Sequence, residues 1–156
     1  SLNKLVLFDL CKYNFHETVL KLLDTPTLCS YKHFNKTTPL ILSCKNGWTD
    51  VALKILDQYE DAEVDYVDVV DNNTALMIAC FSNMKEVALK ILEQPDKCNI
   101  RHANKYGISA YQFAQQNNNK DLMKKIFDYL NSESVIKIKN NKKKNEKLIK
   151  VYRNHS

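Results

Sequence analysis

The sequence has only two glycines and three prolines among its 156 residues. Glycine and proline interrupt helices, so a chain made mostly of helices is expected to contain few of them. No apolar stretch approaches the roughly 20 residues of a membrane-spanning helix, and the start shows no secretory signal peptide. We therefore expect one soluble intracellular domain. Its first residue is Ser1 and not Met, so the chain could be a piece of a longer protein.

Catalytic motifs are also missing. There is no glycine-rich phosphate loop, no His-Glu-x-x-His and no Gly-x-Ser-x-Gly, and each of these would be the starting point of an enzymatic hypothesis. The four histidines are scattered over linkers and the C-terminal segment. We therefore expect no enzyme, no cofactor and no small-molecule substrate.

An internal repeat is the strongest feature that is present. "VALKIL" occurs at residues 51–56 and again at 87–92, and longer related segments begin at Leu5, Thr38, Thr74 and Ser109. The spacings of these four starts are 33, 36 and 35 residues. A fixed period in this range is typical of proteins built from stacked repeats.

Each unit has the pattern of two helices. A column suited to left-handed backbone, and therefore to ending the first helix, holds Asn14, Gly47, Asn83 and Asn118. The second helix has one apolar face, as at Val51, Ala52, Ile55 and Leu56. Its other face has an acid four residues before a lysine, in the pairs Glu17–Lys21, Asp50–Lys54, Glu86–Lys90 and Asp121–Lys125. We expect these charges to pair along a solvated helix face, at roughly 0.2–0.5 kcal/mol for each pair.

The cysteines number five, and an odd number without a signal peptide argues against a disulfide framework. Cys11, Cys44 and Cys80 occupy one column of the repeat. A free cysteine behaves as a small hydrophobic residue when buried. We expect these three thiols to be buried and reduced against the neighbouring repeat.

The other two cysteines form C-x-x-x-H pairs, Cys29 with His33 and Cys98 with His102. These residue types suit zinc, so a metal site is the alternative to ordinary packing. The pairs lie two repeats apart, however, and each supplies only two ligands. We therefore expect no metal site.

The repeats resemble ankyrin repeats, which have a period of about 33 residues and carry T-P-L-H-x-A at the first helix. "TPLILSC" from Thr38 and "TALMIAC" from Thr74 match this motif in part, with Ile41 and Met77 in the place of the family's histidine. The resemblance covers about residues 3–131. The phrase "ILEQPDKCNI" and the many Asn and Lys residues also resemble ankyrin-repeat proteins of giant amoeba-infecting DNA viruses.

This resemblance implies an all-α ankyrin-repeat solenoid of four helix-turn-helix repeats. The expected repeats span about 1–32, 33–68, 69–103 and 104–133, which gives a repeat domain over 1–133 and a basic C-terminal extension over 134–156. The extension has eight Lys or Arg residues against one acid, a net charge of +7, whereas the whole chain carries +5. The repeats themselves are therefore mildly acidic, at −2.

Two roles fit the basic extension. We favour a solvated segment, which could include a helix that covers the end of the stack, because solenoids need polar or covered ends. The alternative is contact with nucleic acid through charge neutralisation, and a basic run is also a weak signal for nuclear import. The candidate nucleic-acid contacts are Lys142, Lys143, Lys144, Lys147 and Lys150.

The resemblance also implies a function, which is to bind a partner protein on a concave surface. In this family the contact residues lie on the linker tip before each first helix and just after that helix ends. Carried over, these positions are Tyr13, Phe34, Asn35, Lys45, Asn46, Val70, Asp71, Phe81, Ser82, Lys105, Tyr106 and Ile108. We expect a partly exposed stripe centred on Phe34, Phe81 and Tyr106.

Three hypotheses about the partner follow. The first is a protein partner, such as a host factor engaged by a viral protein in the host cytoplasm. The second is an accessory protein that binds nucleic acid through the extension, with nuclear localisation as an option. The third is an adaptor for a ubiquitin ligase, although no F-box-like segment is evident.

Overall fold

The computed structural model describes residues 2–25, 37–59, 62 and 64–153, with side chains described at 7–25, 37–59, 62, 64–132 and 140–143. Helices and two isolated antiparallel bridges, Val67–Thr74 and Ala103–Ser109, make up the regular structure of these residues. The helices are α1 (Leu2–Lys12), α2 (His16–Leu23), α3 (Pro39–Lys45), α4 (Thr49–Gln58), α5 (Ala75–Phe81), α6 (Lys85–Ile91), η1 (Pro95–Lys97, a 3-10 turn), α7 (Ala110–Gln116) and α8 (Lys120–Arg153).

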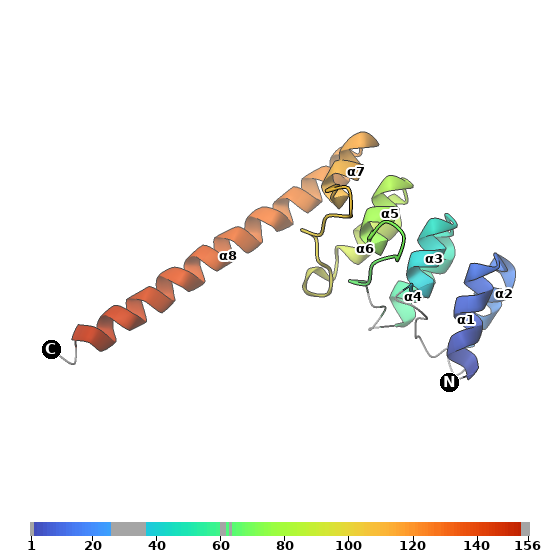
Figure 1. Ribbon diagram of the computed structural model, residues 1–156, viewed down its shortest axis with the longest axis horizontal. Coiled ribbons are helices and arrows are strands. Elements are labelled where there is room, and N and C mark those ends of the chain that lie inside the picture. Colours follow the sequence, from blue (N-terminus) through green and yellow to red (C-terminus); the bar gives the residue numbers. More distant parts are fainter. Residues whose placement is uncertain (1, 26–36, 60–61, 63, 154–156) are drawn as a thin grey trace.

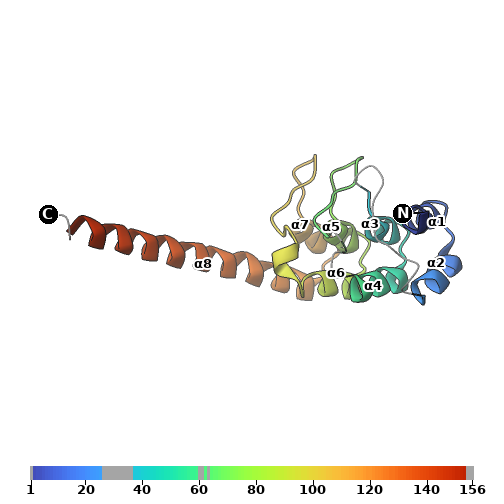
Figure 2. The same ribbon diagram turned by 90° about the horizontal axis from the view of Figure 1, so that it is seen from below.

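The α-helices form antiparallel pairs that stack side by side. The first helices α1, α3, α5 and α7 lie in one layer, and α2, α4, α6 and the start of α8 lie in a second layer (Figure 1). Two hairpin loops, bridged at Val67–Thr74 and Ala103–Ser109, rise on one side of the first layer (Figure 2). The extended solenoid expected from the repeat pattern is therefore present.

The first helices α3, α5 and α7 begin directly after the repeat starts Thr38, Thr74 and Ser109, and all four first helices end where the repeat pattern predicts. The hydroxyls of Thr38 and Thr74 accept hydrogen bonds from the N–H groups three residues later, at 3.1 and 3.3 Å, and Ser109 forms a capping box with Gln112. The predicted helix stops all have positive φ: Asn14 at 67°, Gly47 at 72°, Asn83 at 55° and Asn118 at 51°. The left-handed column is therefore confirmed.

The predicted cysteine column is also confirmed. Cys11 and Cys44 are fully buried, Cys80 is 1% exposed, and all three are free thiols. Burial raises the pKa of Cys44 and of Cys80 to about 12, because the apolar interior disfavours the thiolate. The thiols of Cys44 and Cys80 therefore stay protonated at neutral pH and act as packing groups.

The charges of the second helices have a different role from the one predicted. The structure joins them across neighbouring pairs: Asp50 with His16, Lys54 with Asp24, Lys90 with Asp57, and Asp121 with Lys85. Pairing of Asp50 with Lys54 inside one helix was therefore the wrong prediction. The second helices of neighbouring pairs pack side by side, so a charge can find its partner in the adjacent helix instead of in its own.

The last helix continues far beyond the stack. Its first turns pack against α7 and α6, and it then projects away from the other helices (Figure 1). It runs without a break across the predicted boundary at residues 133 and 134. The distal part of α8 therefore does not cover the end of the stack (Figure 1), which was one form that we had expected of the extension.

Candidate functional site

The two hairpin tips are organised by one polar side chain each. Oδ1 of Asp68 accepts hydrogen bonds from the N–H groups of Asp71 and Asn73, both at 3.0 Å. Oδ1 of Asn104 accepts from the N–H groups of Tyr106 and Ile108, at 3.0 and 2.9 Å. Such side-chain turns satisfy amide groups that the tight loop cannot pair with the backbone.

The tip between residues 67 and 74 carries a buried charge. Asp68 is 1% exposed, and Lys45, at the end of α3, places its ammonium 2.6 Å from Oδ2 of this carboxylate. Burial by itself would raise the pKa of Asp68, but the hydrogen bonds from Lys45 and from the tip N–H groups outweigh burial and lower it. Asp68 is therefore ionised at neutral pH and ties the tip to the preceding helix pair.

The two tips are also joined to each other. The ammonium of Lys105 lies 2.8 Å from the carboxylate of Asp71 and donates to the carbonyl of Val70 at 2.7 Å. The same ammonium lies 4.9 Å from the centre of the Tyr106 ring, whose hydroxyl donates to Asp71 at 3.3 Å. These contacts hold the neighbouring tips in one arrangement without covering their outer surface.

Large apolar side chains remain exposed on the two tips and at the end of α5. The exposed fractions are 64% for Val69, 61% for Val70, 62% for Phe81 and 65% for Tyr106. The Phe81 ring packs edge-on against the buried Phe113 of α7, with ring centres 5.3 Å apart. Phe81 is thus fixed along one edge and free over most of its surface.

The structure places the other predicted contact residues in different settings. Tyr13 is 63% exposed, and Lys45, Asn46 and Ser82 are exposed at the ends of first helices. Ile108 is half-buried and packs against the core, so it belongs to the scaffold as much as to the surface. Phe34 and Asn35 lie outside the described residues.

The helix-end asparagines contact the preceding helix pair. Nδ2 of Asn46 donates to the carbonyl of Cys11 at 2.9 Å, and Nδ2 of Asn117 donates to the carbonyls of Cys80 and Phe81, both at 2.7 Å. Both side chains therefore donate to carbonyls at the end of a first helix in the preceding pair. Their first role is in stacking.

The sequence analysis missed three residues of the tips. Val69 was overlooked because the tip that contains it is one residue longer than its equivalent, which leaves two valines outside. Asp68 and Asn104 could have been found from their type, since Asp and Asn before a left-handed residue favour side-chain turns. The left-handed residues are Asn72 and Gly107, with φ of 64° and 75°.

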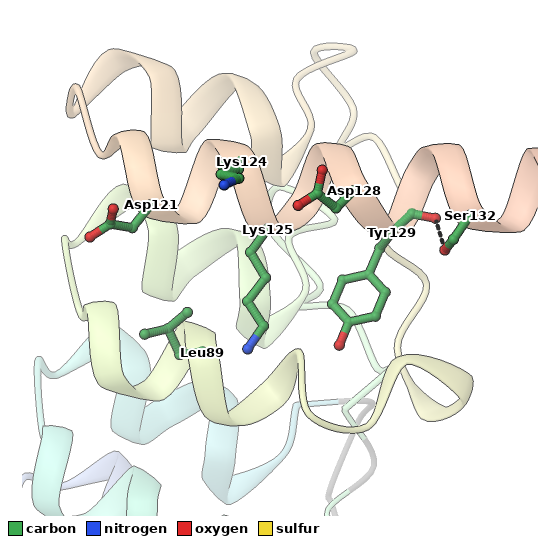
Figure 3. A pocket seen from close by; sticks show the side chains of 7 residues that line it. All are labelled: Leu89, Asp121, Lys124, Lys125, Asp128, Tyr129 and Ser132. Carbon is green, nitrogen blue, oxygen red and sulfur yellow. Dashed lines mark hydrogen bonds between the residues drawn. The ribbon is translucent and has the colours of Figure 1, made fainter.

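A groove of about 600 Å³ lies between α6 and α8 on the other side of the stack. In Figure 3 the side chains of Lys125 and Tyr129 point from α8 toward α6. The charged lining consists of two acids and two lysines: Asp121, Asp128, Lys124 and Lys125. This balance gives the groove no preference for a charged ligand.

The described residues contain no group of three or more His, Cys, Asp or Glu side chains placed to hold a metal ion. The Cys98 thiol is buried, and burial raises its pKa to about 12. Nε2 of His102 lies 2.7 Å from the carbonyl oxygen of Asn72. Cys29 and His33 lie outside the described residues.

The basic extension is helical up to Arg153, and the side chains of Lys142 and Lys143 are exposed on it. The side chains of Lys144, Lys147 and Lys150 lie outside the described part of the chain. Despite the length of α8, none of the described helices is long and apolar enough to span a bilayer.

Comparison with known proteins adds one finding. A family model of ankyrin repeats, in three copies, matches residues 7–102, which hold most of the first three helix pairs and the tip at residues 67–74, and which end before the tip at residues 103–109. A search of the curated proteins found no match.

Proposed function

This chain belongs to the ankyrin-repeat family, and we propose that it binds a partner protein through a tip surface made of Val69, Val70, Phe81 and Tyr106. Ankyrin repeats are generally protein-interaction modules, because stacked repeats present an extended rigid surface. The family alone does not identify the surface or the partner. The proposal therefore rests on the exposed side chains of this chain.

We also propose that α7 and the first turns of α8 form a fourth repeat. The family match ends at residue 102, but the Ser109 cap and the left-handed Asn118 recur at the repeat spacing. Asn117 reaches back to the end of α5 as Asn46 reaches back to the end of α1. These shared contacts favour a repeat of the same kind.

The exposure of Phe81 is the observation that carries the proposal. An aromatic ring that is 62% exposed and held edge-on by Phe113 loses little conformational freedom when a partner covers it. Rings of this kind dominate many protein interfaces, often at 2 kcal/mol or more each. Tyr106 is similarly held, through Lys105 and Asp71.

The charges near the tips indicate what kind of contact to expect. Lys105 and Asp71 already pair with each other, so neither presents an uncompensated charge to a partner. We therefore expect apolar contacts to supply most of the affinity on the tip surface. Binding there should depend only weakly on ionic strength, because salt chiefly screens interactions between charges.

The test begins with a partner captured by the wild-type protein and identified by mass spectrometry. Its affinity is then measured for wild type, Phe81→Ala and Phe15→Ala. Phe15 is a matched control, since it is an aromatic residue with 54% exposure at the start of α2. We expect Phe81→Ala to weaken binding at least about tenfold, roughly 1.4 kcal/mol, and Phe15→Ala to have little effect. Equal affinity of folded Phe81→Ala and wild type would contradict the tip surface.

The projection of α8 supports a second function, binding of nucleic acid. A helix that extends from the stack and exposes Lys142 and Lys143 could follow a phosphate backbone. Truncation after Glu133 should then abolish binding to duplex DNA or RNA. Wild-type affinity should fall steeply between 50 and 200 mM salt, to an extent set by the number of phosphates contacted. Unchanged affinity after truncation would exclude this role of the extension.

The viral role stays a prediction. It rests on the resemblance of the sequence to ankyrin-repeat proteins of giant viruses, and a host factor would be the corresponding partner. The hypothesis of an adaptor for a ubiquitin ligase also stays a prediction. Identification of the captured partner addresses both hypotheses directly.

A further inference from the structure

Three positions of each helix pair face the pair that follows in the stack. In the first pair they are fully buried, and α1 and α2 pack against α3 and α4 of the following pair. These positions are Leu7, Val19 and Leu23 in the first pair, Leu40, Ala52 and Leu56 in the second, and Leu76, Ala88 and Leu92 in the third, with exposed fractions of 0–4% throughout.

The same positions of the last pair are Tyr111, Met123 and Phe127. Phe127 is 54% exposed, and Tyr111 and Met123 are only partly buried. Among the described residues, no element covers the side of α7 and α8 turned away from α5 and α6 (Figure 1). We call these three residues the terminal face.

The terminal face is not adapted to water in the way that the other end of the stack is. In α2, Thr18 stands in the column that holds the buried Val51, Val87 and Leu122 in later repeats, and it is exposed. Solenoid ends commonly gain solubility through such polar replacements. At the terminal face the residues are large and apolar instead: Met123 follows Ala52 and Ala88 in its column, and Phe127 follows leucines in every earlier repeat. An apolar surface of this kind indicates an interaction site.

The terminal face contains a cleft whose charged lining residues are all positive. A concavity of about 310 Å³ is lined by Tyr111, Met123 and Phe127 together with Lys120 and Lys124. Both lysines are exposed. Unlike the groove between α6 and α8, this cleft has no acid among its lining residues.

We propose that the terminal face docks an amphipathic helix of a partner protein, with apolar residues seated on Phe127 and acidic residues directed to Lys120 and Lys124. A helix is the fitting shape because helices cover the equivalent face of every earlier pair. This site is separate from the tip surface and does not depend on it.

Charge decides between this partner and a second copy of the chain. Residues 120–153 contain eleven Lys or Arg and four acids, a net charge of +7. Two copies joined at the terminal face would bring two such helices together, and like charges repel. An acidic helix would instead be attracted to the same surface.

The experiment uses the full chain and two synthetic amphipathic peptides of about 18 residues, or roughly five helical turns. One has leucine on one face and glutamate on the other, and the second has lysine in place of glutamate. Isothermal titration should give at least tenfold tighter binding for the glutamate peptide. Phe127→Ala should reduce that affinity at least tenfold, and Phe81→Ala, on the tip surface, should leave it unchanged.

Two further variants separate charge from apolar contact. Lys120→Glu with Lys124→Glu should remove the preference for the glutamate peptide, whereas Lys142→Glu with Lys143→Glu, farther along α8, should leave most of it. Equal binding of both peptides, or unchanged binding by folded Phe127→Ala, would overturn the proposal. A dimer in sedimentation that Phe127→Ala disrupts would also overturn it, in favour of a second copy.

Discussion

The two hairpin tips perform the same structural task with different chemistry. Asp68 and Asn104 each accept two backbone hydrogen bonds through Oδ1. The remaining atom differs: the second carboxylate oxygen of Asp68 recruits the ammonium of Lys45, while Nδ2 of Asn104 donates to Oδ1 of Asn73 at 2.9 Å. The organising side chain of one tip therefore forms an ion pair with its neighbour, and that of the other tip forms a neutral hydrogen bond.

The two tips show that one loop shape can accommodate either aspartate or asparagine at its organising position. The geometry needs only an oxygen that accepts from two N–H groups, and both side chains supply it. The remaining polar atom of the side chain, an oxygen in Asp68 and an amide nitrogen in Asn104, then determines which neighbouring residue the tip binds. The charged version is stronger in hydrogen bonding but depends on pH, because a carboxylate can be protonated whereas an amide cannot.

The largest expected effect comes from removing the organising side chains. Asp68→Ala should lower the free energy of unfolding by about 3 kcal/mol, since it removes two charge-assisted hydrogen bonds and the partner of Lys45. Asn104→Ala should cost less, about 1.5 kcal/mol, because its bonds are neutral. Urea unfolding at neutral pH measures both values. Equal losses would show that the charge of Asp68 contributes nothing beyond the shared geometry.

An effect of intermediate size is expected from pH, which should change the stabilisation contributed by Asp68 but not that contributed by Asn104. The pKa of Asp68 is lowered in the folded state, and the unfolded value is about 3.9. The stabilisation is therefore fully present above that value and is lost as pH falls through the folded-state pKa. Asp68→Asn keeps the oxygen acceptor and should cost about 1 kcal/mol at pH 7.

The control for this pH dependence lies in the same variant. Thermal unfolding of Asp68→Asn between pH 5 and 2.5 should lose less stability than wild type, because its amide does not titrate. If both proteins lose stability in parallel over this range, other carboxylates govern the acid response and the Asp68 account is wrong.

The smallest expected effect concerns the link between the tips. Lys105→Ala removes the ion pair with Asp71, and because both side chains are partly exposed the loss of stability should be smaller than that of Asn104→Ala. The hydrogen bond with Asp71 raises the pKa of Lys105, so this contact should persist throughout the neutral range. Chemical denaturation measures the stability, and a loss comparable to that of Asn104→Ala would contradict the ranking.

Features that depend on residue type or on the repeated sequence pattern were predictable from the sequence. The left-handed stops at Asn14 and Gly47 follow from residue type, and the burial of Cys44 follows from its place in a repeated apolar column. The exposure of Phe81 and Tyr106 was predictable as well, since both occupy positions that the ankyrin-repeat resemblance places at the surface. Each of these properties repeats at a fixed period, so a sequence pattern is enough to reveal it.

The tertiary structure alone decided which polar groups meet. The spacing of Asp50 and Lys54 permits a pair within one helix, worth only a few tenths of a kcal/mol, but stacking offers each residue a partner in the preceding pair, His16 and Asp24. Such partners lie 30 or more positions away, and no local pattern encodes their distance. The exposure of Phe127 has the same origin, because the residue continues a buried column and only the position of the last helix pair in the stack leaves it uncovered.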